Sequence, residues 1–447
     1  MLIVLLLLCL HAHGLAVGMS GCPCGFLVYL VGGFCIAYIV AEVVKRWNGM
    51  REFTKIRNDL TRFVETDTRL NSLYPPQYLH FLAGTPLVTS RSAPNVPWMD
   101  ASEEGVTEVK ARLMKRIEAA ADTLPVFADA LKYSQHKSGK LIRSRLIVLL
   151  AKSLRLDKEK WEKVLLLAQA VELEHCASLL HDDVVDEADM RRGIESVRKK
   201  FGDRTAVLTG DNLISILVDV LSEIRIMEVT ETVSHSIEAL VIGELLQLMT
   251  SPSSGDAGHS VVLQQLLFPL HVGDGETLHR IQLYIRKSYF KTASLFAGLA
   301  GCVGIIANVP QSDRNALSSF GFFFGLAFQL VDDVLDLADV DPSAVGKPVG
   351  GSDVRNGTVT LPVLLACVDE KRLDDSERSA LKQMVSRRFR REGDSERTLA
   401  LLAKSDGIAQ SRRVVSYYLD QCRRALVAAK VGNDLEGLLS DYEARQF

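Results

Sequence analysis

The sequence predicts an all-α fold packed as a helical bundle. Apolar residues recur at three- and four-residue spacing over long stretches, such as 161–181 and 315–337, which is typical of helices that bury one face. Strand-like alternation bounded by hairpin turns is hard to find. Helical patterns dominate from about residue 101 to the end, so we expect helices packed on helices.

The composition is that of a folded globular protein. Of 447 residues, 47% are hydrophobic and 24% are charged, so a sizeable core can form. The formal net charge is −3 and no basic stripe dominates, which gives no reason to expect nucleic acid as a partner. None of the eight cysteines forms a C-x-x-C pair, so neither a zinc site nor a redox motif is indicated.

The N-terminal segment, residues 1–44, is apolar. No Lys, Arg, Asp or Glu occurs before Glu42, and 26–44 approach the roughly 20 residues that span a bilayer. Basic residues follow at once, which places that end in the cytosol or matrix. We expect a membrane anchor or a targeting region; the alternative is translation that begins at Met19 or Met50.

Residues 45–100 form a mixed connector with several prolines, and 101–447 form the main helical domain. Two loops interrupt this domain. Residues 251–277 begin and end with turn-forming residues, which predicts an insertion between helices. Residues 340–360 are rich in glycine, which suits a flap over a phosphorylated ligand and equally suits a plain surface loop.

The first chemically suggestive motif is HDDVVDEADMRRG at 181–193. On a helix, Asp182 and Asp186 share a face one turn apart, with Asp183 beside them. Like charges at this spacing repel one another and need a cation, and carboxylate oxygens suit Mg²⁺. Two arginines suited to bidentate phosphate binding follow, Arg191 and Arg192. Alone, this motif is more typical of a solvated acidic face.

A second motif makes a metal site the favoured interpretation over a solvated acidic face. Residues 329–336, QLVDDVLD, place Asp332, Asp333 and Asp336 at the same spacing at the end of an apolar helix. A solvated face is less natural there. Two such clusters on facing helices of a bundle would hold a diphosphate between Mg²⁺ ions, and coincidence becomes the minority interpretation.

Basic residues recur near these motifs. Lys140 and Arg143 are three residues apart, so on a helix they would grip one phosphate group together. Lys291 and Lys347 lie near other candidate elements. Singly, each is an ordinary surface lysine, and His175 is more typical of a structural helix residue. As a set they are less easily dismissed and indicate an anion site.

These segments together resemble the trans-isoprenyl diphosphate synthases, the polyprenyl synthetase family, and in particular the long-chain (solanesyl- or decaprenyl-type) synthases. The resemblance runs from about residue 105 to 447. The motifs stand in family order: SGKLIR, LEHCASLLHDDVVDEADMRRG, AVLTGDNL, IGELLQL, YFKTASLF, FQLVDDVLDL, GKPVGGSD and TLPVLLA. The resemblance implies an isoprenoid-synthase-like bundle around a central metal and diphosphate cavity, with 101–447 as the catalytic domain.

The resemblance also implies a role for each matching residue. The isopentenyl diphosphate site would comprise Lys140, Arg143, His175 and Arg192. The allylic diphosphate would be held by Arg191, Lys291, Thr292, Gln329 and Lys347, with Gln247 lining the same cavity. The catalytic metal ligands would be Asp182, Asp183, Asp186, Asp332, Asp333 and Asp336, with Lys291 as a further catalytic residue.

The reaction that the resemblance implies is the Mg²⁺-dependent, head-to-tail condensation of isopentenyl diphosphate with an allylic diphosphate. Mg²⁺ and the cations stabilise charge on the departing diphosphate. The double bond of isopentenyl diphosphate then attacks the allylic carbocation, and a proton is lost. No protein nucleophile is required, which agrees with the absence of a convincing triad in the sequence.

Product length depends on the residues one turn before the first motif. Ala177 and Ser178 are small, whereas short-chain members of the family carry bulky aromatic stoppers there. We therefore expect a long-chain product of C30 to C50, with a geranylgeranyl-type product as the alternative. Glu174, one turn further back, is poorly suited to line an apolar tunnel.

Other functions fit less well. A terpene cyclase would be expected to lack the second motif and the pair Lys140 and Arg143, and a non-catalytic partner subunit would be expected to have lost some aspartates. A third alternative is a membrane scaffold in which catalysis is secondary. We expect a homodimer, with a heteromeric synthase as the alternative. By family analogy, the product supplies quinone side chains in a membrane-linked, mitochondrial setting, with endomembranes as the alternative.

Overall fold

The computed structural model describes residues 98–123, 125–135, 139–250, 276–338 and 350–444. The predicted N-terminal segment lies outside these residues, as does nearly all of the connector. Within them the chain is almost entirely helical, with one pair of two-residue strands. The prediction of an all-α fold is confirmed.

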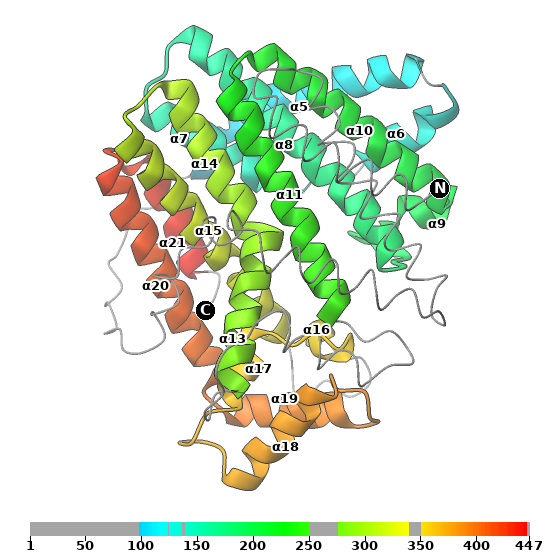
Figure 1. Ribbon diagram of the computed structural model, residues 1–447, viewed down its shortest axis with the longest axis vertical. Helices are drawn as coiled ribbons and strands as arrows, with labels where there is room; N and C mark the ends of the chain where they lie inside the picture. Colours follow the sequence, from blue (N-terminus) through cyan, green and yellow to red (C-terminus); the bar gives the residue numbers. More distant parts are fainter. Residues whose placement is uncertain (1–97, 124, 136–138, 251–275, 339–349, 445–447) are drawn as a thin grey trace, which may run out of the picture.

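In the described part of the chain, ten long helices build the bundle (Figure 1). They are α5 (Trp98–Thr123), α7 (Ile142–Ser153), α8 (Lys158–Val185), α10 (Asp203–Ile224), α11 (Met227–Thr250), α13 (Glu276–Ser288), α14 (Ser294–Ala307), α15 (Gln311–Ala338), α18 (Asp375–Ser386) and α20 (Gly407–Ala428). Shorter elements connect them: η3 (Pro125–Phe127), α6 (Ala128–Ser134), β1 (Met190–Arg191), β2 (Ile194–Glu195), α9 (Val197–Phe201), η4 (Tyr289–Ala293), α16 (Ser352–Arg355), α17 (Leu361–Ala366), α19 (Asp394–Lys404), η5 (Asn433–Leu435) and α21 (Glu436–Ala444). In Figure 1, α18 and α19 lie at the end of the molecule opposite α5 and α7.

The two helices that carry the aspartate motifs are the longest described, and both contain the stretches predicted to be helical. α8 begins at the N-cap Asp157, whose side chain accepts a hydrogen bond from the Lys160 backbone N–H (2.9 Å). Both helices span 28 residues. α8 packs mainly on α10 and α7, whereas α15 packs on α14 and α20, so each motif helix lies deep within the bundle.

Small residues let α15 approach its neighbours closely. A Cβ atom on Gly325 would lie 2.5 Å from the Cα of Ala293 in η4, so a larger residue would push the two elements apart. On either side, aromatic rings fill the contact; Phe296 and Phe324 meet edge to face with centroids 5.3 Å apart. This close contact fixes the second aspartate motif against the Lys291 segment.

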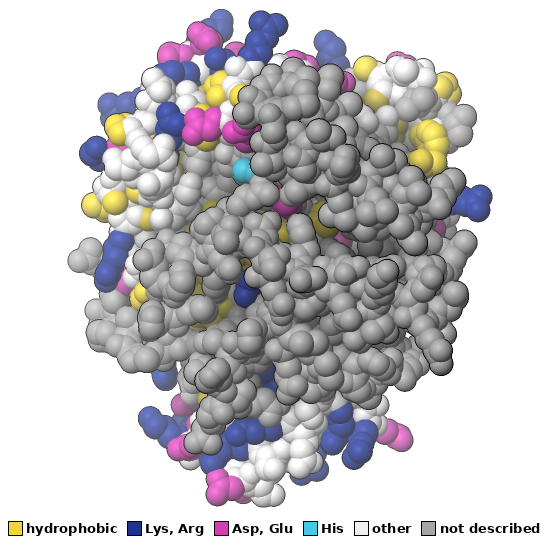
Figure 2. All heavy atoms as spheres, viewed as in Figure 1, with side chains coloured by type: hydrophobic (Ala, Val, Ile, Leu, Met, Phe, Trp, Pro, Cys, Tyr) yellow, Lys and Arg dark blue, Asp and Glu magenta, His cyan; other side chains and the backbone are white. Residues whose placement is uncertain are grey.

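Two described helical stretches are long and apolar enough to cross a membrane, namely 203–224 and 283–307. Half of the first apolar window and 78% of the second are buried inside the bundle, and core helices of globular proteins have the same properties. They therefore give no support for a membrane span. On the face shown in Figure 2, the described Lys and Arg side chains are interspersed with acidic ones at both ends of the view.

Candidate active site between two aspartate motifs

The first aspartate motif lies where α8 ends. Asp182 belongs to the last turn, and Asp186 is the C-cap residue, whose backbone N–H donates to the Asp182 carbonyl oxygen (2.8 Å). The helix therefore does not continue through the following arginines, as a single 181–193 helix would require. Asp182 is half-buried, while Asp186 is exposed. Both carboxylates therefore lie at the C-terminal end of α8 with some access to solvent.

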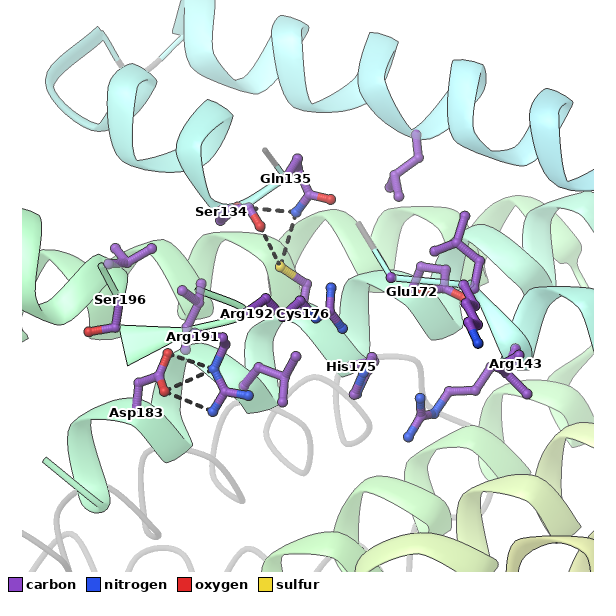
Figure 3. Close-up of a pocket in the computed structure, with 18 of the residues that line it drawn as sticks. Ser134, Gln135, Arg143, Glu172, His175, Cys176, Asp183, Arg191, Arg192 and Ser196 are labelled. Carbon is purple, nitrogen blue, oxygen red and sulfur yellow. Dashed lines mark hydrogen bonds and ion pairs between the residues drawn. The ribbon is translucent and has the colours of Figure 1, made fainter. Parts of the chain in front are cut away.

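A hairpin returns Arg191 to this motif. Strands β1 and β2 pair antiparallel, and left-handed φ angles at Arg192 (51°) and Gly193 (75°) make the tight turn between them. The Arg191 Nε donates to both carboxylate oxygens of Asp183 (2.9 and 2.8 Å), and its Nη2 lies 2.7 Å from Oδ1 (Figure 3). Because Asp183 is 2% exposed, this ion pair anchors the hairpin to the helix.

Asp182 lies in an acidic environment. Burial, together with the charges of Glu244 of α11 and the neighbouring Asp186, raises the pKa of its carboxyl to about 8, while Lys291 and Arg191 oppose the shift. Asp182, Asp186 and Glu244 therefore all act on the Lys291 ammonium group. This arrangement favours an added cation, because a cation would relieve the repulsion that now keeps the Asp182 proton bound.

A single π-helical turn, η4, presents Lys291 and Thr292 to the site. The Lys291 Nζ forms an ion pair with Glu244 Oε1 at 2.7 Å. The Thr292 hydroxyl donates to Gln329 Oε1 at 2.8 Å, which links the turn to α15. Gly243 permits the close approach of α11, because a Cβ there would lie 2.8 Å from the Lys291 Cγ.

The second motif, on α15, is arranged differently. Asp333 is 4% exposed and accepts hydrogen bonds from the Tyr284 hydroxyl (2.5 Å) and the Gln329 amide (3.0 Å). Burial raises the pKa of Asp333 to about 6, although these two donors oppose the shift. Its neighbour Asp332 is exposed and lines a cavity. Tyr284 carries no sequence signal that distinguishes it from an ordinary core tyrosine.

Asp336 connects α15 to the chain that follows. Its carboxylate accepts hydrogen bonds from the Ser352 backbone N–H (3.1 Å), the Ser352 hydroxyl (2.5 Å) and the Asp353 backbone N–H (3.0 Å). These donors belong to the first turn of α16, which a carboxylate stabilises. Asp336 thus anchors α16, and its role as a metal ligand stays a prediction.

A cavity of about 630 Å³ brings the predicted residues together. The sequence-predicted residues that line it are Lys140, Arg143, His175, Asp183, Arg191, Arg192, Thr292, Gln329 and Asp332. Lys140 precedes α7, and Leu141 between them adopts a left-handed conformation (φ 50°), so Lys140 and Arg143 do not share one helix face. Both still reach the cavity, and part of each aspartate motif meets there.

The cationic side of this cavity is crowded. Burial lowers the pKa of Arg143, whose guanidinium lies 5.4 Å from the Phe296 ring centroid. Burial, and then the charge of Arg143, holds the pKa of His175 well below its usual range, so the imidazole is neutral at physiological pH. Glu172 faces this group and accepts hydrogen bonds from the Ser144 hydroxyl (2.6 Å) and backbone N–H (3.3 Å). A diphosphate would complement the guanidinium charge.

Of the other predicted residues, two are wholly or partly outside the described part of the chain, and the chain-length residues are buried in α8. Lys347 lies outside the described residues, and for Gln247 only the helical backbone of α11 is described. Ala177 and Ser178 are buried in α8 and are not among the residues lining this cavity. Glu174 is 1% exposed, and burial raises its pKa to about 8.

A metal ion at this site would need ligands in addition to the protein's carboxylates. Among the described side chains, no three from His, Cys, Asp and Glu converge closely enough to hold a metal by themselves. Mg²⁺ characteristically takes one or two carboxylates and completes its shell with water and substrate phosphate. Asp182, Asp186 and Asp332 fit that requirement, because they lie at the helix end or the cavity wall and two of them are crowded by like charge.

Known proteins share both sequence and fold with this chain. The polyprenyl synthetase family matches residues 124–402. A prenyl transferase of Synechocystis sp. is 32% identical over 326 residues, which cover 73% of this chain and 90% of that protein. The mitochondrial hexaprenyl pyrophosphate synthase of Saccharomyces cerevisiae is 34% identical over 283 residues, 58% of this chain and 57% of that one.

Solved structures give the same result for the fold. A polyprenyl synthase from Caulobacter crescentus, complexed with calcium and isoprenyl diphosphate, is 27% identical with a TM-score of 0.61, covering 80% of this chain and 98% of that one. A decaprenyl diphosphate synthase from Rhodobacter capsulatus is 27% identical with a TM-score of 0.62, covering 79% and 98%. A geranylgeranyl pyrophosphate synthetase from Pyrococcus horikoshii is 25% identical with a TM-score of 0.60, covering 77% and 97%. The predicted isoprenoid-synthase-like fold is confirmed.

Proposed function

Because this chain belongs to the polyprenyl synthetase family and is a prenyltransferase, we propose that its cavity binds isopentenyl diphosphate beside an allylic diphosphate and joins them into a long-chain trans-polyprenyl diphosphate. The observation that carries the proposal is that a cationic wall meets Asp183 of the first motif and Asp332 of the second in one cavity of about 630 Å³. Binding a negatively charged diphosphate requires cationic groups. Cleavage of the allylic carbon–oxygen bond also requires groups that stabilise the negative charge on the departing diphosphate.

Each part of the site has a distinct task in this proposal. Lys140, Arg143 and Arg192 bind isopentenyl diphosphate, and neutral His175 orients it without adding charge. Thr292 and Gln329 lie against the allylic diphosphate. Asp182, Asp186 and Asp332 would hold Mg²⁺, which supplies charge neutralisation on the departing diphosphate.

The chemistry follows from that arrangement. The allylic carbon–oxygen bond breaks, and the diphosphate keeps the electron pair while the neighbouring cations receive its charge. The isopentenyl double bond attacks the resulting carbocation, and the released diphosphate takes the proton that restores a double bond. Arg191, fixed by Asp183, supplies a preorganised positive group at the cavity wall, which lowers the reorganisation required during ionisation.

We expect a product of C30 to C50. Relatives named hexaprenyl and decaprenyl synthases support this length, as do the small residues Ala177 and Ser178 before the first motif. The likeness to a geranylgeranyl synthetase means that the fold alone does not select the length. The purified full-length protein should be incubated with labelled isopentenyl diphosphate, an allylic primer and Mg²⁺, and the product sized by chromatography. A product no longer than C20 would refute long-chain synthesis in favour of the medium-chain alternative.

The setting of the reaction is a further part of the proposal. Three relatives are named as mitochondrial or probable mitochondrial hexaprenyl synthases, which supports a mitochondrial role in making quinone side chains. We propose a homodimer attached to the membrane through residues 1–44. Light scattering of the active protein and fractionation of cells would check both points. Inactivity of the purified chain alone, with activity restored by a second polypeptide, would instead indicate a heteromeric synthase.

A further inference from the structure

Glu244 is a buried acid that the proposed reaction does not use. It lies on α11 with its side chain 18% exposed, and its Oε1 is 2.7 Å from the Lys291 Nζ, whose side chain is 23% exposed. Partly buried ion pairs of this kind hold their members more firmly than surface pairs do. The pair therefore sets where the Lys291 ammonium stands before substrate arrives.

The backbone is built to bring these two residues together. Gly243 precedes Glu244, and a Cβ on it would lie 2.8 Å from the Lys291 Cγ and 2.9 Å from the Lys291 backbone nitrogen. No real side chain fits at such distances, so α11 touches η4 only because residue 243 is glycine. The π-helical turn of η4 in turn directs the Lys291 side chain toward α11.

Glu244 competes with the first aspartate motif for this lysine. The acids that act on the Lys291 ammonium are Glu244 first, then Asp182 and then Asp186. If Glu244 were neutral, Asp182 would be the acid with the strongest remaining effect on the ammonium. A Lys291–Asp182 pair would neutralise both the group that receives diphosphate and a carboxylate needed for the metal.

We propose that Glu244 is a positioning residue that holds Lys291 beside the first aspartate motif and prevents it from closing onto Asp182. This role rests on the proposed function, because it requires that the restrained Lys291 binds the allylic diphosphate and that Asp182 binds the metal. It differs from direct metal binding, because the Glu244 carboxylate is engaged by the Lys291 ammonium at 2.7 Å.

The test is a double-mutant cycle with E244Q and K291Q, read out as Mn²⁺ binding to the substrate-free, full-length protein by electron paramagnetic resonance. E244Q alone should weaken Mn²⁺ binding by about tenfold, because the freed lysine pairs with Asp182 and the metal must displace it. In the K291Q background, E244Q should have no such effect. A second readout is the Mg²⁺ concentration for half-maximal synthesis, which should rise in E244Q, with partial rescue in E244D.

A matched control is available on the same helix. Glu228, in the first turn of α11, forms an ion pair with Arg314 in the first turn of α15 (3.0 Å). Because Glu228 lies sixteen residues before Glu244 on the same helix, E228Q should leave Mn²⁺ binding unchanged. Equal weakening of Mn²⁺ binding by E244Q with and without Lys291 would overturn the proposal, because Glu244 would then bind the metal itself. A fall in thermal stability with unchanged Mn²⁺ binding would overturn it in favour of a purely structural role. The metal measurements need no turnover, so failure of the proposed synthase activity would be seen separately.

Discussion

The two aspartate motifs have the same D-D-x-x-D spacing but different surroundings. In the first, Asp183 is held by the charged Arg191 of a hairpin, and Asp182 lies among other acids. In the second, Asp333 is held by the neutral groups of Tyr284 and Gln329, while the third aspartate anchors α16. The comparison teaches that a charged group of the protein holds the second aspartate of the first motif, whereas neutral donors hold the second aspartate of the second motif.

The largest expected effect on activity compares Asp182, the first aspartate of the first motif, with Asp336, the last aspartate of the second motif. Asp182→Asn should lower the rate of isopentenyl incorporation by roughly a hundredfold to a thousandfold, because it removes charge that the metal requires. Asp336→Asn should lower it far less, since its carboxylate binds Ser352 and Asp353 within the protein. Steady-state assays over a range of Mg²⁺ concentrations measure both. Equal losses would show that the two motifs contribute ligands symmetrically.

The helices that carry the motifs also differ in the residue that lies two turns before the first aspartate. This difference should make protein stability depend on pH. Eight residues before Asp182 stands the buried acid Glu174, and eight residues before Asp332 stands the core ring Phe324. Burial raises the Glu174 pKa from 4.5 to about 8. A carboxyl that is harder to ionise when folded costs stability as pH rises from its unfolded to its folded pKa.

The free energy of unfolding of the wild type should therefore fall between about pH 4.5 and pH 8, by at most roughly 1.4 kcal/mol per pH unit from this group. Glu174→Gln should remove that part of the slope, and its advantage over the wild type should grow with pH. Denaturant titrations at several pH values measure this. Parallel stability curves for the two proteins would mean that Glu174 ionises freely in the folded state. Phe324→Leu serves as the control, since it alters packing without a titratable group.

The smallest effects separate the two middle aspartates. Asp183→Asn leaves the Arg191 charge without its partner and should cost about 2 kcal/mol of stability, a figure discounted because the Arg191 side chain is 35% exposed. Asp333→Asn still accepts a hydrogen bond from Tyr284 and should cost about 1 kcal/mol or less. Tyr284→Phe should cost a similar amount. Chemical denaturation gives all three values, and the reverse order would contradict the assignment of charged and neutral anchors.

Much of the fold could be predicted because helical periodicity is local. The stretches 161–181 and 315–337 lie within α8 and α15 as expected. The end of the first motif helix was harder to predict, because 181–193 contains good helix formers and the hairpin depends on left-handed φ angles at Arg192 and Gly193. The ion pair between Arg191 and Asp183 stabilises that turn. It is a tertiary contact, so local sequence patterns do not reveal it.

The candidate site was predicted as a set of residues but not as an arrangement. The motif sequences named nine residues that line one cavity. They gave no sign of Tyr284, and Glu244 stands within the quoted motif IGELLQL without an assigned role, because a tyrosine or a glutamate on a helix has many ordinary uses. Lys347 and the predicted N-terminal anchor lie outside the described residues and stay predictions.

The sequence by itself determined the helical class, the family and the two acidic motifs, because periodicity and motif spacing are properties of neighbouring residues. Only the tertiary structure decided which aspartates face other acids and which are held by protein donors. That decision depends on contacts such as those of η4 with α11 and α15, whose distances no local pattern contains. Charge in a buried site is set by what surrounds it in space, and so the same five-residue spacing acquires two different roles.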